Sequence, residues 1–467
     1  MLSLRFRILL FFCLLAVAGA GLAAGALFFG WWRAENPLPT APFVTAFVLF
    51  AFLNTGLIAA VWILFDENVA KPINTLSARL RLRAHAGVDA EIGADDARYL
   101  GDLAPAANAL TQTVSGSLME SAAQVAQETR RLRDEHDRLT ALLSEIPLAT
   151  VLVNPAQEIV LYDGQAAEIL SQIAPPRLKA PLSDYFDPAE IKSAMAQLSS
   201  TCGEIAFVLH DATRQTRFNA RIKALNADGH MIFIDAASEQ TERVAARPLV
   251  FDFDLMAAQE VREIADTPLS ELCFVPFDTE TTGLSVAQDD IVQIGAVRVL
   301  NGRMVDGETF ECYVNPGRAI PPASTRIHHV TDAAVADAPD IGKAGRALHH
   351  FARGAVLVAH NALFDIGLLR KYEPRMGVTW DHAVLDTVLL SAVVFGTTED
   401  HSLDALCARL GVTIPGHLRH TALGDARATG EALVKLLPLL EAKGTRCFGD
   451  LIQQTRQHGR LLEDLNG

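Results

Sequence analysis

Hydrophobic and polar residues are distributed very unevenly along the 467-residue chain. Two uncharged apolar runs, 8–32 and 43–65, lie near the N-terminus. Each is longer than the roughly 20 residues that a helix needs to span a bilayer. The first run is too long for the apolar core of a signal peptide, and a second run follows it closely. We therefore expect two transmembrane helices within residues 1–66.

Apolar residues recur at helical spacing beyond these runs. Residues 67–117 resemble a HAMP linker, loosely, and residues 118–146 form a heptad seam whose steps alternate between 4 and 3. Such a seam is typical of a coiled coil. Because two spans that enter side by side leave these helices pointing the same way, we expect a parallel homodimer that pairs through the seam.

Five short strand-like runs replace the helical pattern in residues 147–240: 151–154, 159–162, 204–210, 217–225 and 231–235. Their order resembles a PAS domain, an α+β fold, and the last of them completes the expected sheet by about residue 240. Residues 241–271 read as an acidic linker. The sequence thus predicts a PAS-like domain between the coiled coil and the C-terminal part of the chain.

A pair of carboxylates follows a short apolar strand in the C-terminal part. Residues 275–277 precede Asp278 and Glu280, which are two positions apart. Side chains at i and i+2 of a strand point the same way, and two like charges repel unless a cation lies between them. A hard divalent cation prefers such oxygen ligands. By itself the pair is weak evidence, because solvated pairs of this kind are common.

Two further acidic positions follow later elements. Asp365 opens a helical stretch just after the apolar run 355–359, which reads as a buried strand. Asp425 lies on a helix for which Thr421 is a candidate N-cap. His420 is five residues before Asp425, about 500° around a helix, so we expect it on the preceding loop. A histidine there can act as a general base.

These blocks resemble the DEDDh 3′–5′ exonucleases, the group that contains the proofreading epsilon subunit of bacterial DNA polymerase III. The resemblance covers residues 272–443, and the histidine before the last aspartate is typical of the His subclass. Other segments that match this family are 291–295, 327–331, 386–387 and 401–406. The resemblance implies an α/β domain with a ribonuclease H-like mixed sheet, its first three strands antiparallel. Residues 444–467 read as a short helical tail.

The resemblance also implies the chemistry. Two divalent cations, Mg²⁺ or Mn²⁺, would be held by Asp278, Glu280, Asp365 and Asp425, and His420 would take a proton from the attacking water. The residues that it implies for binding the terminal nucleotide are Thr281, Thr282, Gly283, Leu284, Asn361 and Phe364. The expected substrate is a nucleic acid 3′ end, with single-stranded DNA favoured. Short RNA stays open, as does a catalytically silent scaffold that uses the nuclease fold for binding.

Two positions depart from the family pattern. Pro276 stands in what should be a central strand, where a proline removes a ladder donor. His329 stands where a glycine is common. Neither position changes the carboxylates.

Charge and cysteine content refine this picture. The formal charge of −15 argues against broad electrostatic affinity for nucleic acid, so grip on substrate should come from the metals and the terminal nucleotide. The six cysteines show no paired spacing, which indicates neither a zinc site nor a disulfide framework. Lys and Arg residues flank the two spans on the outer sides of the hairpin, which predicts cytoplasmic termini. We expect a multi-pass protein of the bacterial inner membrane with a cytoplasmic exonuclease domain.

Overall fold

The structure, a computed structural model, describes residues 4–33, 39–75, 77–78, 148–198, 203–225, 229–235, 249–256 and 262–466. The chain divides into two compact units, Met1–Ser121 and Ala122–Gly467. The predicted coiled-coil seam at 118–146, with the homodimer that depends on it, lies outside the described residues, as does most of the HAMP-like segment 67–117.

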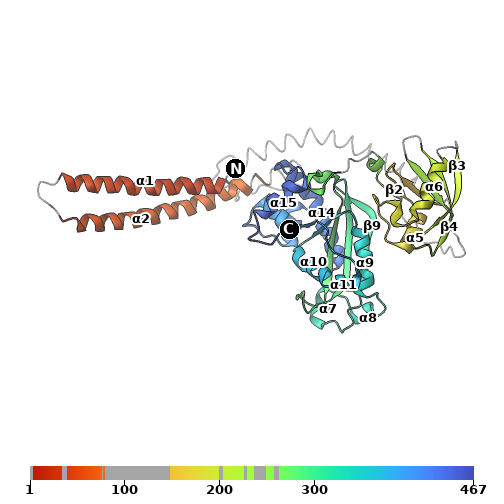
Figure 1. The fold of residues 1–467 in the computed structure, drawn as a ribbon. Helices are drawn as coiled ribbons and strands as arrows, with labels where there is room; N and C mark the ends of the chain where they lie inside the picture. Colours follow the sequence, from red (N-terminus) through yellow and green to blue (C-terminus); the bar gives the residue numbers. More distant parts are fainter. Residues whose placement is uncertain are drawn as a thin grey trace, which may run out of the picture. The chain divides into compact units, whose positions relative to one another are not determined.

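The first unit contains a helical hairpin (Figure 1). Its elements are α1 (Leu4–Trp32), α2 (Ala41–Phe65) and a π-helical turn η1 (Asp66–Ala70), from which the helix continues to Thr75. The Asn54 amide donates a hydrogen bond to the Ala16 carbonyl at 3.3 Å, and Gly19 lies against the same amide. Most apolar side chains point outward; Leu22 and Phe52 are each 77% exposed. Both helices are long and apolar enough to cross a membrane, with mean hydropathy of 2.4 and 2.3.

The second unit begins with a six-stranded antiparallel sheet in the order β3-β4-β5-β1-β2-β6. We call residues 148–256 the N-terminal sheet domain. All five strand-like runs that the sequence predicts form strands here, and the described part of the segment expected to be a linker adds β6 at the sheet edge. The elements are β1 (Ala149–Val153), β2 (Ile159–Tyr162), α5 (Gly164–Ile173), η3 (Leu182–Asp184), α6 (Pro188–Leu198), β3 (Glu204–His210), β4 (Arg217–Ala224), β5 (His230–Ile234), β6 (Val250–Phe251) and η4 (Phe253–Met256).

Residues 262–466, the C-terminal domain, contain a five-stranded mixed sheet in the order β11-β10-β7-β8-β9. The first three strands in sequence pair antiparallel, as predicted, whereas β10 pairs parallel with both β7 and β11. Two short 3-10 turns precede the sheet, η5 (Ile264–Asp266) and η6 (Leu269–Glu271). The strands are β7 (Phe274–Thr281), β8 (Ile291–Leu300), β9 (Arg303–Tyr313), β10 (Val356–Ala359) and β11 (Val384–Asp386).

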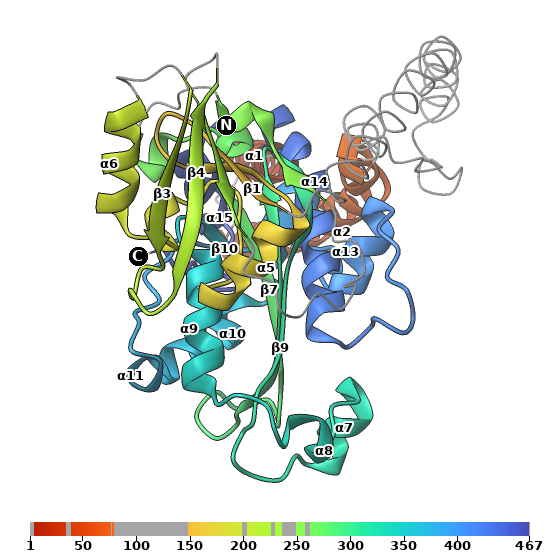
Figure 2. The same ribbon diagram turned by 90° about the vertical axis from the view of Figure 1, so that its right-hand side faces the viewer.

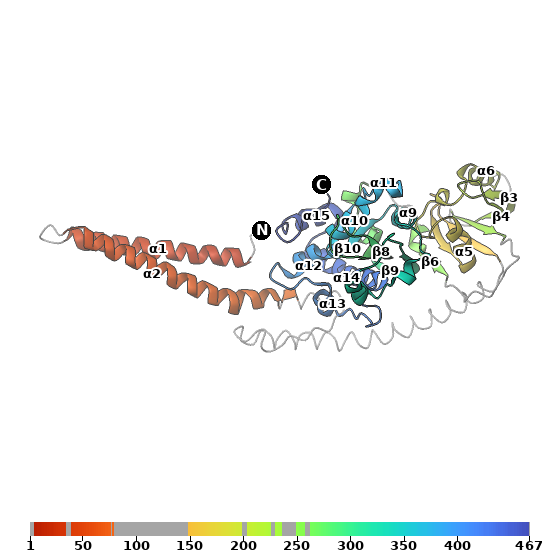
Figure 3. The same ribbon diagram turned by 90° about the horizontal axis from the view of Figure 1, so that it is seen from below.

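Helices cover both faces of this sheet. Figure 2 shows α13 and α14 on one side of it and α9 and α10 on the other. The C-terminal helix α15 packs against α12 and closes this end of the domain (Figure 3). The helices are α7 (Pro322–His328), α8 (Asp332–Val335), α9 (Ile341–Ala352), α10 (Ala362–Lys371), α11 (Glu373–Met376), α12 (Thr387–Phe395), α13 (Leu403–Leu410), α14 (Ala422–Ala442) and α15 (Phe448–Arg456).

Pro276 lies in the central strand β7, as expected from the sequence. The pairing of β7 with β8 runs from Phe274 opposite Val299 to Phe277 opposite Ala296 and skips the two residues between. On its other side β7 keeps its parallel pairing, with Pro276 opposite Val358. Because proline has no N–H, the missing donor is confined to one side of the strand. The sheet therefore accommodates it four residues before Glu280.

His329 adopts the left-handed conformation, with φ of 62°, and ends α7 as its C-cap. Glycine takes this conformation without the steric penalty that a Cβ brings. The backbone thus explains why a glycine is common at this position. Histidine is among the residues that tolerate it best after glycine.

Candidate active site

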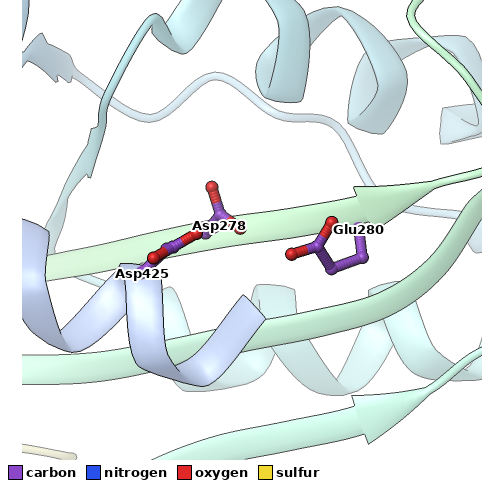
Figure 4. Close-up of side chains that lie close together, drawn as sticks. All are labelled: Asp278, Glu280 and Asp425. Atoms are coloured by element: carbon purple, nitrogen blue, oxygen red, sulfur yellow. The ribbon is translucent and has the colours of Figure 1, made fainter. Parts of the chain in front are cut away.

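Three carboxylates from two elements meet at the centre of the C-terminal sheet. Asp278 and Glu280 project from the same side of β7, and Asp425 lies in the first turn of α14 (Figure 4). Ligand oxygens of all three lie within 4.8 Å of one another. Each residue is partly buried. The sequence correctly predicted this convergence for three of its four acidic positions.

Close packing of α14 on β8 brings Asp425 to the strand. Gly295, directly opposite Asp278 in the β7–β8 ladder, lies under the start of the helix. A Cβ atom there would meet the Leu423 nitrogen at 2.1 Å, so only glycine permits this approach. The Gln293 side chain accepts a hydrogen bond from the Ala422 nitrogen at 3.2 Å. Thr421 caps the helix by accepting from the Gly424 nitrogen, as predicted.

Asp365 occupies a different position from the other three carboxylates. It lies buried in the first turn of α10, and its Oδ1 accepts hydrogen bonds from the Thr279 nitrogen at 3.1 Å and the Thr279 hydroxyl at 2.5 Å. It is not among the three residues whose ligand atoms cluster within 4.8 Å. Its charge nevertheless contributes to the raised pKa of Asp278 and of Glu280. Asp365 therefore lies next to the cluster, and its hydrogen bonds to Thr279 fix it to β7.

The electrostatics of the cluster are dominated by burial and mutual repulsion. Burial raises the pKa of Asp278 well above its ordinary value, and Asp365, Glu280 and Asp425 raise it further. Burial, followed by Asp425 and Asp365, raises the pKa of Glu280 to about 8. Burial raises the pKa of Asp365 to about 7 although the Thr279 hydrogen bonds oppose this shift. The cluster therefore holds protons at neutral pH unless positive charge is supplied.

This donor set fits a divalent cation. Its members offer only carboxylate oxygens, the ligands that Mg²⁺ and Mn²⁺ prefer. A cation among Asp278, Glu280 and Asp425 would replace the repulsion that raises their pKa values with attraction. The acidic cluster is thus a candidate metal centre, and Asp365 stands next to it as a further oxygen donor.

His420 lies on the loop before α14, as predicted. It is exposed and adopts the left-handed conformation, with φ of 57°. Burial raises the pKa of the Asp425 carboxyl, and the nearby His420 opposes this shift. The hydrogen bond from Arg419 lowers the pKa of Asp404, and His420 adds to that shift. Its neighbour Arg419 forms an ion pair with Asp404. The loop therefore places one imidazole beside the acidic cluster with access to solvent.

The expected nucleotide-binding residues lie at the end of β7, where Thr281 is the last residue of the strand and Thr282, Gly283 and Leu284 follow it in a turn. The Thr281 hydroxyl donates to the Gly283 carbonyl at 2.6 Å, and the Thr282 hydroxyl donates to Asp289 at 3.0 Å. Leu284 is 92% exposed.

Side chains from two distant segments hold this turn in place. The Arg318 guanidinium donates to the Thr282 hydroxyl at 2.5 Å and the Gln288 carbonyl at 2.8 Å, and it pairs with Asp290 at 2.6 Å. Lys371, at the end of α10, donates to the Asp289 carbonyl at 2.7 Å. The turn is thereby tied to the same helix that carries Asp365.

Asn361 and Phe364 lie at the start of α10. Asn361 is exposed, precedes the helix in the left-handed conformation with φ of 65°, and makes no side-chain cap. Asp386 supplies the cap instead, since its carboxylate accepts from the Asn361 and Ala362 nitrogens at 3.2 and 2.8 Å. Phe364 is partly buried and packs against the core. Phe364 therefore directly precedes Asp365, and Asn361 lies four residues before it.

Several contributors to the site were not assigned a role from the sequence. They are Thr279, Gln293, Gly295, Arg318 and Asp386, which position other groups. Gln293 had a visible signal, because it is the one uncharged polar side chain within an otherwise apolar stretch of strand. Arg318 had no such signal, because it is 36 residues away in sequence from Thr282, to which it donates.

The fold and the acidic cluster define a nuclease-type domain, and sequence comparison places it in a family. A family model described as Exonuclease (RNase_T) matches residues 275–433. A "DNA polymerase III subunit epsilon-like protein" of Rhodobacter capsulatus is 32% identical, over 100% of this chain and 99% of that protein. The chain belongs to this family of DNA polymerase III epsilon-like proteins and carries an exonuclease domain.

Other similar proteins match a smaller share of this chain. "DNA polymerase III PolC-type" of Caldanaerobacter subterraneus is 39% identical over 38% of this chain, which spans 12% of that protein's length. Among solved structures, "Exonuclease X in complex with 5' overhanging duplex DNA" is 29% identical, with a TM-score of 0.32, over 39% of this chain and 99% of that one. E. coli Exonuclease I in complex with a dT13 oligonucleotide is 18% identical, with a TM-score of 0.32, over 37% and 41%.

We predict that Gly295→Ala disables the site through geometry, with every carboxylate retained. The added methyl group must displace the first turn of α14, and Asp425 with it. A nuclease assay on the full chain in detergent should show a loss of at least about 10²-fold, the scale expected of misplaced groups. Ala296→Gly, one position along the same strand, is the matched control. Unchanged activity in Gly295→Ala would show that the close approach of α14 is not needed.

The raised carboxyl pKa values predict that the metal-free protein loses stability as pH rises. The folded state retains protons that the unfolded state, with carboxyl pKa values near 4, has already released. Stability should therefore fall as pH rises from about 4 through about 8, the pKa of Glu280. Thermal unfolding in EDTA across this range measures the slope. Asp278→Asn should flatten the slope relative to the unaltered chain, and Asp306→Asn, an exposed position, should not. Equal slopes for all three would contradict the repulsion.

Proposed function

We propose that this chain is a membrane-anchored, metal-dependent 3′–5′ exonuclease that removes nucleotides from the 3′ end of DNA. The observation that carries the proposal is the convergence of Asp278, Glu280 and Asp425 within 4.8 Å in an exonuclease domain. An intact acidic set with a neighbouring histidine favours catalysis over a silent binding module. The epsilon-like and PolC-type relatives favour DNA over RNA.

In this proposal Asp278, Glu280, Asp365 and Asp425 hold two divalent cations, Mg²⁺ or Mn²⁺. Bound cations would acidify a water and balance the charge of the phosphodiester. His420, exposed beside Asp425, accepts the proton of the attacking water. Because the Oδ1 atom of Asp365 accepts hydrogen bonds from Thr279, its other carboxylate oxygen would contact a metal. The Thr279 hydrogen bonds thus orient Asp365 for this role.

The terminal nucleotide binds to the turn after β7. Thr281, Thr282 and Gly283 present backbone groups to it, and the exposed Leu284 covers its base. Burying a leucine side chain that is 92% exposed would add roughly 1.5–2 kcal/mol to binding, without need of net positive charge on the protein. Asn361 and Phe364 line the same groove at the start of α10.

The remaining parts anchor and regulate this domain. We assign 1–66 to two membrane spans, 67–117 to a HAMP-like linker, 118–146 to a coiled coil that dimerises the chain, 147–240 to a PAS-like domain, 241–271 to a linker, 272–443 to the exonuclease domain and 444–467 to a helical tail. The five expected strands in 148–235 support the PAS-like assignment. The two apolar helices and the flanking Lys and Arg residues support an inner-membrane anchor with cytoplasmic termini.

The function is tested by cleavage of 5′-labelled single strands of DNA and RNA of matched sequence by the full chain in detergent. We expect stepwise shortening of the DNA from its 3′ end with Mg²⁺ or Mn²⁺, and none in EDTA. Asp278→Asn should remove nearly all activity, and His420→Ala should lower it by about 10² to 10⁴. Asp306→Asn is the matched control. Faster cleavage of RNA would favour the exoribonuclease alternative, and activity that survives EDTA would exclude metal-dependent chemistry.

Arg318 should affect substrate binding more than turnover, because it orders the nucleotide-binding turn without reaching the carboxylates. Charged hydrogen bonds are worth roughly 1.5–3 kcal/mol, so Arg318→Ala should raise KM about tenfold or more with a smaller change in kcat. Arg318→Lys keeps the charge but loses the planar fork and should rescue only in part. Arg303→Ala, exposed at the far end of β9, is the control. A fall in kcat at constant KM would contradict this role.

A further inference from the structure

A buried ion pair of the C-terminal domain lies where that domain contacts the N-terminal sheet domain. Arg298 on β8 and Glu308 on β9 pair at 2.8 Å between Nε and Oε2, with side chains 1% and 0% exposed. Both belong to the C-terminal sheet. A buried pair is stable only where the remaining polar atoms also find partners. The two domains lie within one compact unit.

The N-terminal sheet domain supplies several of those partners. The Tyr162 hydroxyl, at the end of β2, donates to Glu308 Oε1 at 3.1 Å, and the Leu178 nitrogen donates to the same oxygen. The Leu178 carbonyl accepts from Arg298 Nη2 at 3.1 Å. The last guanidinium group, Nη1, donates to the Phe351 carbonyl of α9 at 3.0 Å. Groups from both domains therefore form hydrogen bonds to the pair.

Contacts around this pair extend the junction. Arg353 pairs with Asp184 at 2.7 Å, and Tyr185 meets His350 edge to face at 5.4 Å. Asn301, at the β8–β9 turn, donates to Asp252 at 2.7 Å. Apolar side chains of the two domains also form one continuous core cluster. Hydrogen bonds, ion pairs and apolar contacts thus all join the two domains at this junction.

The junction acts on the strand that supports the acidic cluster. Strand β8 carries Arg298, held by the N-terminal sheet domain, and three residues earlier Gly295, on which α14 rests. Gln293 on the same strand binds the Ala422 nitrogen. A displacement of β8 at Arg298 would therefore shift the start of α14, and Asp425 with it.

We propose that the N-terminal sheet domain and the C-terminal domain fold as one cooperative unit, and that the Arg298–Glu308 pair couples them. This junction is the route by which a change of state in the N-terminal sheet domain reaches the exonuclease site. The coupling rests on the junction alone, whereas its regulatory meaning rests on the proposed function. The C-terminal domain is accordingly not an independent module on a flexible tether.

Trp380 provides a local probe of this coupling. It is 3% exposed in the C-terminal domain, and the other three of the chain's four tryptophans lie in or near the apolar runs at positions 31, 32 and 62. Replacing those three with phenylalanine leaves a full chain whose tryptophan fluorescence reports the C-terminal domain alone. The substitution Ile222→Ala, in the core of β4, weakens the N-terminal sheet domain without touching the junction.

In this background Ile222→Ala should lower the midpoint of the Trp380 transition by several degrees, in step with the circular dichroism of the whole chain. Adding Glu308→Gln should uncouple the two domains, so that Ile222→Ala no longer lowers the midpoint of the Trp380 transition. Tyr162→Phe is the milder variant should Glu308→Gln fail to fold, and it should reduce the shift. Asp306→Asn, exposed on the same strand, should leave the coupling intact.

A Trp380 transition that ignores Ile222→Ala in the otherwise unaltered background would overturn the proposal. So would a shift that persists unchanged in both junction variants. Neither result depends on nuclease activity. An inactive chain that still shows the coupled transition would therefore count against the proposed function and not against the coupling.

Discussion

Repulsion among half-buried carboxylates is the constraint on which the rest of the structure depends. Asp278, Glu280 and Asp425 stand closer together than like charges prefer, and burial makes the repulsion stronger. Only covalent and packing constraints hold them there. Asp278 and Glu280 project from the same side of one strand, two residues apart. Asp425 is brought to them by a helix that packs against Gly295. The fold thereby keeps together carboxyl groups that hold protons at neutral pH unless a cation takes their place.

Several hydrogen bonds fix the segments that surround this cluster. Thr279 fixes Asp365 from behind, Gln293 holds the start of α14, and Asp386 caps α10. Arg318 and Lys371 fix the turn that follows β7. Each of these residues ties together segments that are far apart in the sequence. The result is a rigid rim around a site whose centre is electrostatically unfavourable until it is filled.

The other face of the sheet shows the same principle with opposite charges. Arg298 and Glu308 attract each other, yet burial would make even this pair costly if its remaining atoms lacked partners. The N-terminal sheet domain provides those partners through Tyr162 and Leu178. The C-terminal sheet is thus held on one face by α14 and at the other by groups from a second domain. The N-terminal sheet domain therefore contacts the strand that supports the acidic cluster, although it contributes no residue to the cluster.

The sequence by itself determined the elements that local pattern and spacing control. Alternation placed Asp278 and Glu280 on one side of a strand, the capping signal at Thr421 started α14, and two apolar runs gave two long helices. The antiparallel pairing of the first three C-terminal strands followed from the family resemblance. Only the tertiary structure decided that Asp365 turns to Thr279, that Gly295 admits the helix, that Arg318 holds the turn, and that Glu308 is shared between domains. These outcomes depend on close contacts between residues distant in sequence, and no periodicity along the chain encodes such distances.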